Sequence, residues 1–227
     1  MKDPKVIYED NHLLVVNKPT GWLVQGDKTG DRTLTDWAKV YIKRKYDKPG
    51  DVYLHPTHRL DRPVSGILIF ARTSKSLERM NKFFRENEIQ KTYLAIVKGK
   101  PAEMEETLTH YIEKDSKKNT VRAFTRAKTN AKHAELSYDV LAIGDSHSLL
   151  RVKPKTGRPH QIRVQLSKID CPIKGDLRYG YPKANPDKSI NLHAFQISFV
   201  HPVKKEPVKI SCKPEWPDYA SFVNELG

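Results

Sequence analysis

The stretch that decides the fold is HRLDRPVSGILIFART, residues 58–73. Its first half is polar and contains Pro63 and Gly66, two residues that favour tight turns. Its second half is an apolar, β-branched run of strand length, which predicts a buried strand. Asp61 is therefore expected on a tight loop that leads into this strand, where a rigid element presents its carboxylate.

Three potential cations flank this carboxylate in the sequence: His58, Arg59 and Arg62. An aspartate in such company commonly forms a surface ion pair, which contributes about 0 to 1 kcal/mol. The local pattern alone favours that interpretation. The other interpretation is functional, because a fixed carboxylate repels an anionic partner unless it reacts with that partner or holds a cation in place.

The composition is strongly basic. Lys and Arg together number 41 and Asp and Glu 27, so the formal net charge is +14, and the isoelectric point is near 9.6. This excess favours a polyanion as the partner. A merely soluble basic protein is the weaker alternative.

Cysteine and histidine usage points away from disulfides and metals. Cys171 and Cys212 form no Cys-x-x-Cys pair, and the nine histidines are scattered. Reduced thiols in a cytoplasmic protein are expected, with no metal. The N-terminus is polar and the longest apolar runs are only of strand length, so we expect neither an export signal nor a membrane span.

Hydrophobic periodicity predicts strands in runs and a few helices. Helices are expected after the N-cap candidates Thr33 and Ser74, with Trp37 in the core, and after Pro159 and Pro217. Strands are expected at 6–8, 13–16, 66–71, 91–97, 136–140, 149–152, 195–199 and 207–212. The pattern predicts one α+β domain over residues 1–227, its mixed sheet mostly antiparallel and flanked by helices.

The segment 105–132 is polar and rich in Lys and Arg. Its alternating character predicts strands joined by an exposed turn at residues 117–119. A solvated hairpin and a hairpin that grips RNA are equally good interpretations of this segment.

Several enzyme classes lack their motifs. The chain has no Gly-x-Gly, no Gly-Lys-Ser/Thr loop, no His-Glu-x-x-His and no deaminase cysteine pair. A metal-dependent nuclease needs clustered carboxylates, and Asp61 has no acidic neighbour close in sequence. Distant acids can still converge in space. A cofactor-free reaction on RNA, with one carboxylate among arginines, is the remaining hypothesis.

The motifs, taken in order, resemble those of the RluA family of pseudouridine synthases. H-R-L-D-R-x-x-S-G followed by an apolar strand is similar to the family signature around its catalytic Asp. Further matches cover nearly the whole chain: EDNHLLVVNKPTG at 9–21, KTY at 91–93, GRPHQIR at 157–163 with Leu166, GD at 175–176 and LHA at 192–194.

The resemblance implies a cofactor-free isomerisation of a specific uridine to pseudouridine in ribosomal RNA or tRNA. Asp61 would be the catalytic carboxylate, either as a nucleophile or as the base that removes a ribose proton. Arg163 would pair with Asp61, Tyr93 would stack on the uracil and Leu166 would wall the pocket. Arg59 would fill the stack that the flipped uridine leaves.

The resemblance also sets expectations for partners. The partner would be structured RNA, held in part by lysines and arginines, with no membrane and with the protein as a monomer. Many family members carry a small RNA-binding domain first, and its absence is expected here because the opening motif starts near residue 5. The alternatives are a non-catalytic RNA-binding module that keeps the family fold and a metal nuclease.

Overall fold

The computed structural model describes residues 2–26, 30–115 and 120–224. Its chain contacts divide it into two compact units. Unit 1 comprises Met1–Gln90 with Ala194–Lys213, and unit 2 comprises Lys91–His193 with Pro214–Gly227. Asp61 belongs to unit 1, whereas Arg163 belongs to unit 2. The turn expected at 117–119 lies outside the described residues.

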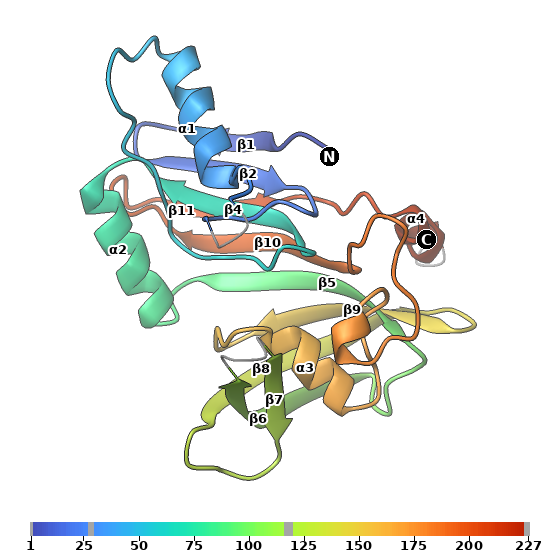
Figure 1. Cartoon of the computed structure of the whole chain (residues 1–227). Coiled ribbons are helices and arrows are strands. Elements are labelled where there is room, and N and C mark those ends of the chain that lie inside the picture. The colour runs from blue at the N-terminus through green and yellow to red at the C-terminus, as the bar shows by residue number, and fades with distance from the viewer. Residues whose placement is uncertain (1, 27–29, 116–119, 225–227) are drawn as a thin grey trace. The chain divides into compact units, whose positions relative to one another are not determined.

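Unit 1 is built on a sheet in which β1, β2, β4 and β10 lie in that order (Figure 1). The strands β1 with β2, β2 with β4, and β10 with β11 pair in antiparallel fashion, and the short β3 pairs with β4 in the same way. Their bounds are Lys5–Glu9 for β1, Leu13–Lys18 for β2, His55–Pro56 for β3, Ser65–Ala71 for β4, Leu192–Val200 for β10 and Pro207–Ser211 for β11.

Two helices accompany this sheet. Helix α1 (Leu34–Lys45) begins with the predicted cap, because Thr33 and Asp36 form a reciprocal capping box. Helix α2 (Ser74–Arg85) is capped by Thr73 rather than by Ser74, so that part of the prediction was wrong. The Thr73 side chain accepts the backbone N–H of Ser76, and Ser74 is already the first helical residue.

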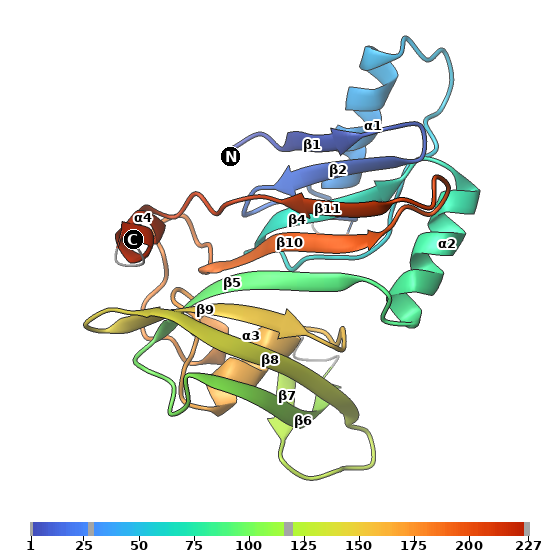
Figure 2. The same cartoon turned by 180° about the vertical axis from the view of Figure 1, so that it is seen from behind.

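The apolar core of unit 1 follows the alternation of the strands. Leu13 and Val15 of β2 and Ile67 of β4 share one buried cluster, against which Met80 of α2 packs. Helix α1 lies over one face of the sheet, as the two opposite views show (Figures 1 and 2). Trp37 on this helix is only partly buried, which differs from its expected place in the core.

Unit 2 is a second antiparallel arrangement with α3 packed on it. The strands β5, β9, β8, β6 and β7 are neighbours in that order. Ile112, Val121 and Ala134 form a small core with Val164 of the helix. The element bounds are Gln90–Lys98 for β5, Glu105–Asp115 for β6, Thr120–Phe124 for β7, Lys132–Ile143 for β8, His147–Pro154 for β9, Gln161–Lys168 for α3, Leu177–Tyr179 for the 3-10 helix η1 and Pro217–Asn224 for α4.

The predicted fold class is therefore confirmed: the fold is α+β, with runs of mostly antiparallel strands and few helices. Within the described part of the chain, no helix is both long enough and apolar enough to cross a membrane.

Candidate functional site

Asp61 lies in a turn at the beginning of β4. The backbone N–H of Val64 donates to the carbonyl oxygen of Asp61 at 3.0 Å, which closes a turn with Arg62 and Pro63 at its centre. In the antiparallel register Lys18 lies opposite Gly66, so the end of β2 lies beside this turn. The Asp61 side chain is half-buried, as a carboxylate must be if it is both fixed in place and accessible.

Lys18 is the unexpected residue of this turn. It is completely buried, and its ammonium donates to the carbonyl oxygens of Pro19 at 3.1 Å, Trp22 at 3.0 Å and Arg62 at 3.2 Å. These acceptors use all three ammonium protons, which is the geometry of the charged form. Burial lowers the pKa of Lys18 to about 7, an effect that Asp61 opposes and Arg62 reinforces.

Arg62 ties the same turn to the segment after β2. Its backbone carbonyl accepts from the Gly21 N–H at 2.9 Å, and its Nε donates to the Gly21 carbonyl at 3.0 Å. Its guanidinium also pairs with Asp31 at 2.8 Å, although both side chains are nearly half exposed. Arg62 therefore acts on the position of the turn mainly through two backbone contacts.

His58 and Arg59 complete the signature. His58 Nε2 accepts the backbone N–H of Ile69 at 3.2 Å, and its ring lies 5.0 Å from that of Phe84. A nitrogen that accepts a hydrogen bond is unprotonated, so His58 acts here as a neutral anchor for β4. Arg59 is exposed, which is compatible with its predicted insertion into an RNA stack.

Together these contacts fix Asp61 through its own backbone and that of its neighbours. Lys18 and Gly21 each bond the carbonyl of Arg62, the residue next to Asp61. These hydrogen bonds hold the peptide groups of the turn, and the Lys18 ammonium also interacts electrostatically with the Asp61 carboxylate. This is a suitable arrangement for a nucleophile or general base, because the reacting group is held in place before the substrate arrives.

Arg163 has a bidentate partner that the sequence did not reveal. Its Nε and Nη2 donate to the two carboxylate oxygens of Asp176 at 2.7 and 2.8 Å. The exposed fractions of the two side chains are only 6% and 1%. The guanidinium also lies 5.0 Å from the ring centroid of Tyr179. The Arg163 side chain is therefore rigidly oriented within unit 2.

The other predicted site residues of unit 2 lie on α3 and β5. Leu166 of α3 is fully buried, so its side chain is not accessible to solvent. Tyr93 is half-buried near the start of β5, opposite Val152. The stacking of Tyr93 on uracil and the pairing of Arg163 with Asp61 remain predictions.

Lys18 and Asp176 are the two residues whose importance the sequence did not show. Both stand in quoted motifs, in Asn17-Lys18-Pro19 and in Gly175-Asp176. Their burial depends on acceptors and donors elsewhere in the chain, such as Arg62, 44 residues from Lys18. Among the described residues, no three His, Cys, Asp or Glu side chains are grouped as metal ligands would be.

Comparison with known proteins identifies consistent relatives. Residues 12–168 match the family model described as RNA pseudouridylate synthase. The chain is 31% identical to tRNA pseudouridine synthase C of Pectobacterium carotovorum subsp. carotovorum over 98% of its own length and 62% of that protein's. It is 33% identical to ribosomal large subunit pseudouridine synthase C of Vibrio vulnificus over 91% of its length and 64% of that protein's.

The fold has solved counterparts as well. Human RNA pseudouridylate synthase domain containing 4 superposes with a TM-score of 0.79 at 25% sequence identity, covering 98% of this chain and 92% of the human chain. The chain thus spans somewhat less than two thirds of the two bacterial relatives named above, and nearly all of the human structure.

Proposed function

Because the chain belongs to the RNA pseudouridylate synthase family, we propose that it isomerises a uridine in ribosomal RNA or tRNA to pseudouridine, with Asp61 as the catalytic carboxylate. The whole of residues 1–227 forms the catalytic domain in this proposal. The reaction takes place without a cofactor, on structured RNA, in the cytoplasm, and the protein acts as a monomer.

The reaction is an internal transfer. The bond between ribose C1′ and uracil N1 breaks, the base turns, and C1′ bonds to uracil C5. The proton at C5 leaves and N1 takes up a proton, so the product has the same composition as the substrate. Asp61 acts in its ionised form, either by attacking the substrate or by removing a ribose proton.

The observation that carries this proposal is the way in which Asp61 is held. A half-buried carboxylate lies on a turn that a buried ammonium and two backbone contacts fix. A carboxylate that served only as a surface ion pair would gain little from such support, because exposed pairs contribute about 0 to 1 kcal/mol. A reacting group gains much more, because a misplacement of about 1 Å can reduce the rate about 100-fold.

The remaining residues act on the substrate in this proposal. Tyr93 stacks on the flipped uracil, Leu166 supports the wall of the pocket and Arg163 orients Asp61. Arg59 enters the stack from which the uridine has left, a flip whose free-energy cost is a few kcal/mol. Basic side chains elsewhere bind phosphates, so the affinity for RNA falls as salt rises.

The decisive experiment replaces Asp61 with Asn and measures tritium release from RNA labelled at uracil C5. We expect a rate loss of about 10⁴-fold or more, because removal of a catalytic nucleophile or base commonly has an effect of this size. Asp51→Asn is the matched control, since it removes the same charge from an exposed position of unit 1. Normal turnover in Asp61→Asn would refute the assignment.

Arg163 needs a control of its own. Arg163→Lys loses the planar fork that holds Asp176, so it weakens a buried pair whatever the guanidinium does for Asp61. Asp176→Asn weakens the same pair from the other side and leaves the guanidinium present. If Arg163 acts on Asp61, Arg163→Lys should lose more turnover than Asp176→Asn, even when the two variants lose the same stability. Equal turnover in the two variants would contradict it.

The non-catalytic alternative predicts that parent and Asp61→Asn bind and remodel RNA alike while neither forms pseudouridine. The nuclease alternative predicts magnesium-dependent cleavage that a chelator stops. The substrate RNA is identified by mapping pseudouridines in total RNA from a deletion strain and its parent. A single site lost in the deletion strain and restored by the parent gene identifies the target.

A further inference from the structure

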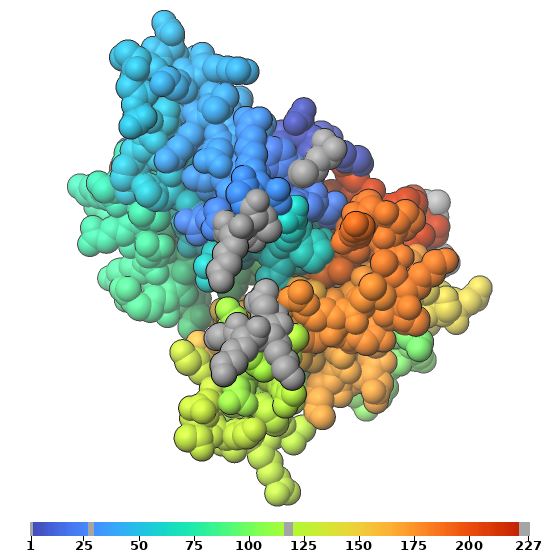
Figure 3. Space-filling model, in the orientation of Figure 1, coloured from blue at the N-terminus to red at the C-terminus, as the bar shows by residue number. Residues whose placement is uncertain are grey.

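Helix α1 carries a surface pocket that the proposed reaction does not use. Its volume is about 500 Å³, which is within the range of small-molecule sites. The side chains of α1 reach the molecular surface in Figure 3. We call this cavity the α1 pocket. Its lining residues are Asp3, Arg32, Trp37, Val40, Tyr41, Arg44 and Lys45.

Part of the lining of the α1 pocket is aromatic. Trp37 and Tyr41 lie one helical turn apart, with ring centroids separated by 5.7 Å and an angle of 10° between the ring planes. Both side chains are only partly buried. The two rings are stacked on each other, and a stacked pair of this kind can be extended by a further ring such as a nucleic-acid base.

The lining of the α1 pocket is also basic. Arg32, Arg44 and Lys45 face a single lining carboxylate, that of Asp3. Lys45 is bound to Glu9 at 2.7 Å, so the two arginines carry the excess positive charge. Arginine suits phosphate because its planar fork can donate two parallel hydrogen bonds. The charge is thus complementary to a nucleic-acid backbone and disfavours a cationic ligand.

The buried carboxylate of Glu9 fixes the position of Tyr41 in the stacked pair. The exposed fraction of the Glu9 side chain is 8%, and Glu9 accepts hydrogen bonds from the Tyr41 hydroxyl at 2.9 Å and the Tyr46 hydroxyl at 2.7 Å. Burial alone would raise the pKa of Glu9, but the bonds from Lys45, Tyr46 and Tyr41 outweigh it and lower the pKa. Tyr41 is therefore positioned before any ligand arrives, which reduces the entropy lost on binding.

We propose that the α1 pocket binds one unpaired nucleotide of RNA, with its base on the ring of Trp37 and its phosphate against Arg32 and Arg44. The base must be unpaired, because a base inside a duplex has no free face to stack on a side chain. The inference rests on the proposed function in that RNA is the substrate. It adds a second RNA contact to the unit that carries Asp61.

The test uses a fluorescein-labelled oligocytidylate of ten nucleotides, which offers bases and phosphates but no uridine for isomerisation. Binding is measured by anisotropy at low salt. Trp37→Ala and Arg44→Ala should each weaken binding about five- to tenfold, the range expected for one stacked base or one phosphate contact. Lys43→Ala is the matched control, since it removes a neighbouring exposed cation that does not line the pocket, and should change affinity less than about twofold.

Two further measurements separate stacking from charge. Trp37→Phe keeps an aromatic face, so it should bind oligocytidylate within about twofold of the parent. In the parent, binding should also quench tryptophan fluorescence, and Trp37→Phe should lose the part of this quenching that comes from Trp37. Inorganic polyphosphate of similar length has no bases, so Trp37→Ala should bind it like the parent. Arg44→Ala should bind both probes more weakly.

Equal affinity of Arg44→Ala and Lys43→Ala for oligocytidylate would overturn the proposal, as would an equal effect of Trp37→Ala on both probes. Arg44 is exposed, so its variant decides the matter even if Trp37→Ala fails to fold. A parent that binds oligocytidylate through Trp37 but forms no pseudouridine would refute the proposed function and leave this site standing. The reverse result would refute the site alone.

Discussion

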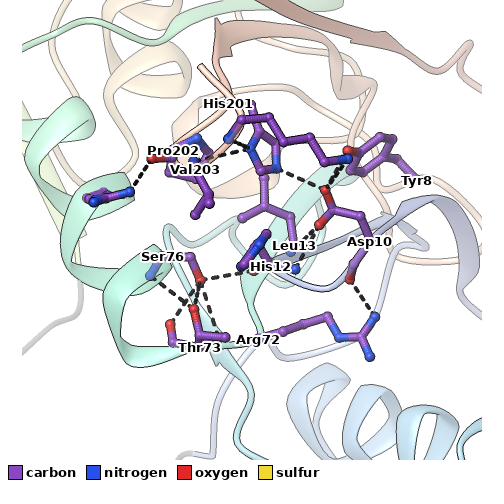
Figure 4. Close-up of polar contacts among 12 residues, drawn as sticks. Tyr8, Asp10, His12, Leu13, Arg72, Thr73, Ser76, His201, Pro202 and Val203 are labelled. Atoms are coloured by element: carbon purple, nitrogen blue, oxygen red, sulfur yellow. Dashed lines mark hydrogen bonds and ion pairs between the residues drawn. The ribbon is translucent and has the colours of Figure 1, made fainter. Parts of the chain in front are cut away.

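The two ends of the β2–β4 pair hold a carboxylate in opposite ways. At the end where β2 begins, Asp10 accepts hydrogen bonds from the backbone N–H groups of His12 and Leu13, both at 2.8 Å, and from the Tyr8 hydroxyl at 2.9 Å (Figure 4). The Lys204 ammonium lies 2.9 Å from the same carboxylate. The oxygens of Asp10 are therefore used by the fold itself.

At the end where β2 finishes, the fold uses peptide groups instead. Lys18 donates to the carbonyl of Arg62, and the Val64 N–H donates to the carbonyl of Asp61. These bonds fix the backbone of the turn, and the Lys18 ammonium also attracts the Asp61 carboxylate. The difference teaches how one strand pair can present two carboxylates: the chain around Asp10 bonds its oxygens directly, whereas the turn that carries Asp61 is positioned through its backbone.

The electrostatics of the two ends differ accordingly. Burial alone would raise the pKa of Asp10, but the His12 N–H, Lys204 and the Leu13 N–H outweigh it and hold the pKa far below its usual range. At the other end the buried group is a cation, and burial lowers the pKa of Lys18 to about 7. The Asp10 end should therefore respond to acid and Lys18 to pH above about 7, while the position of the Asp61 turn depends on the shape of its backbone.

The largest effect is expected for Gly66→Ala, which tests the dependence of the Asp61 end on shape. Gly66 has φ +115°, and an added Cβ would lie 2.5 Å from the backbone nitrogen of Ala194 and 2.9 Å from its carbonyl carbon. These are backbone atoms of a paired strand and cannot yield easily, so we expect a loss of about 4 kcal/mol or more in the free energy of unfolding. Urea denaturation measures it.

Gly50→Ala is the control for this substitution. No atom lies within 4 Å of a Cβ added at Gly50, so its stability should change by less than about 0.5 kcal/mol. Equal stability of the two variants would show that the start of β4 tolerates displacement, and the contrast between the two ends would disappear.

The next effect is that of Lys18→Met, which removes the buried cation and keeps most of the volume. The carbonyls of Pro19, Trp22 and Arg62 lose their common donor, so the free energy of unfolding should fall by about 2 to 3 kcal/mol. Because the Asp61 turn loses its support, kcat should fall about 10- to 100-fold. Tritium release from RNA labelled at uracil C5 measures kcat.

Lys98→Met provides the comparison, since Lys98 also ends a strand but is exposed. It should change neither quantity appreciably. If Lys18→Met lost stability and kept the parent's kcat, Lys18 would be a structural residue without influence on the position of Asp61.

Only part of this contrast could be predicted from the sequence. The apolar run after Gly66 predicted β4 (Ser65–Ala71), and the Thr33 to Asp36 spacing predicted the cap of α1, because both signals are local. The α2 cap was missed because Thr73 and Ser74 are adjacent and equally suited to capping. Trp37 was misplaced because helical spacing gives the direction of a face and not the width of its buried stripe.

The electrostatic partners escaped sequence reasoning for a different reason. Lys18 looks like a charged residue at the end of a strand, and its burial follows from acceptors that the chain brings back 44 residues later. The pair of Arg163 with Asp176 spans 13 residues and a loop whose geometry no periodicity fixes. Motif resemblance predicted Asp61 and Arg163 as site residues that pair with each other, but it did not predict that Lys18 bonds the Asp61 turn or that Asp176 pairs with Arg163.

The Asp10 end should prove the more sensitive to acid, which Asp10→Asn tests. At pH 7 the variant lacks the carboxylate that accepts bonds from the His12 N–H, the Leu13 N–H and the Tyr8 hydroxyl. Its free energy of unfolding should therefore fall by about 2 kcal/mol. The folded-state pKa of Asp10 is depressed, so its stabilisation is fully present above about pH 4 and is lost as the pH falls toward the folded pKa. Parent and variant should therefore converge in stability as the pH falls from 5 to 2.

Denaturation at each pH measures this difference, with Asp51→Asn as an exposed control of equal charge that should change stability by less than about 0.5 kcal/mol. Activity per folded molecule should stay near that of the parent, because Asp10 lies at the end of β2 away from Asp61. A stability difference that stayed constant down to pH 2 would mean that the charge of Asp10 does not stabilise its end of the sheet.

The smallest effect is expected for Tyr8→Phe, which removes one hydroxyl from the Asp10 cluster. The phenol donates to Asp10 at 2.9 Å, and burial together with this bond raises the pKa of Tyr8, so it stays a neutral donor. Loss of one such bond should reduce the free energy of unfolding by about 0.5 to 1.5 kcal/mol. In the Asp10→Asn background the same change should have a smaller effect, because the hydroxyl there bonds an uncharged group. This coupling, measured by a double-mutant cycle, decides whether Asp10 is held by charge-assisted bonds or by shape alone. Additive losses would mean that the charge of Asp10 adds nothing to its bond with Tyr8.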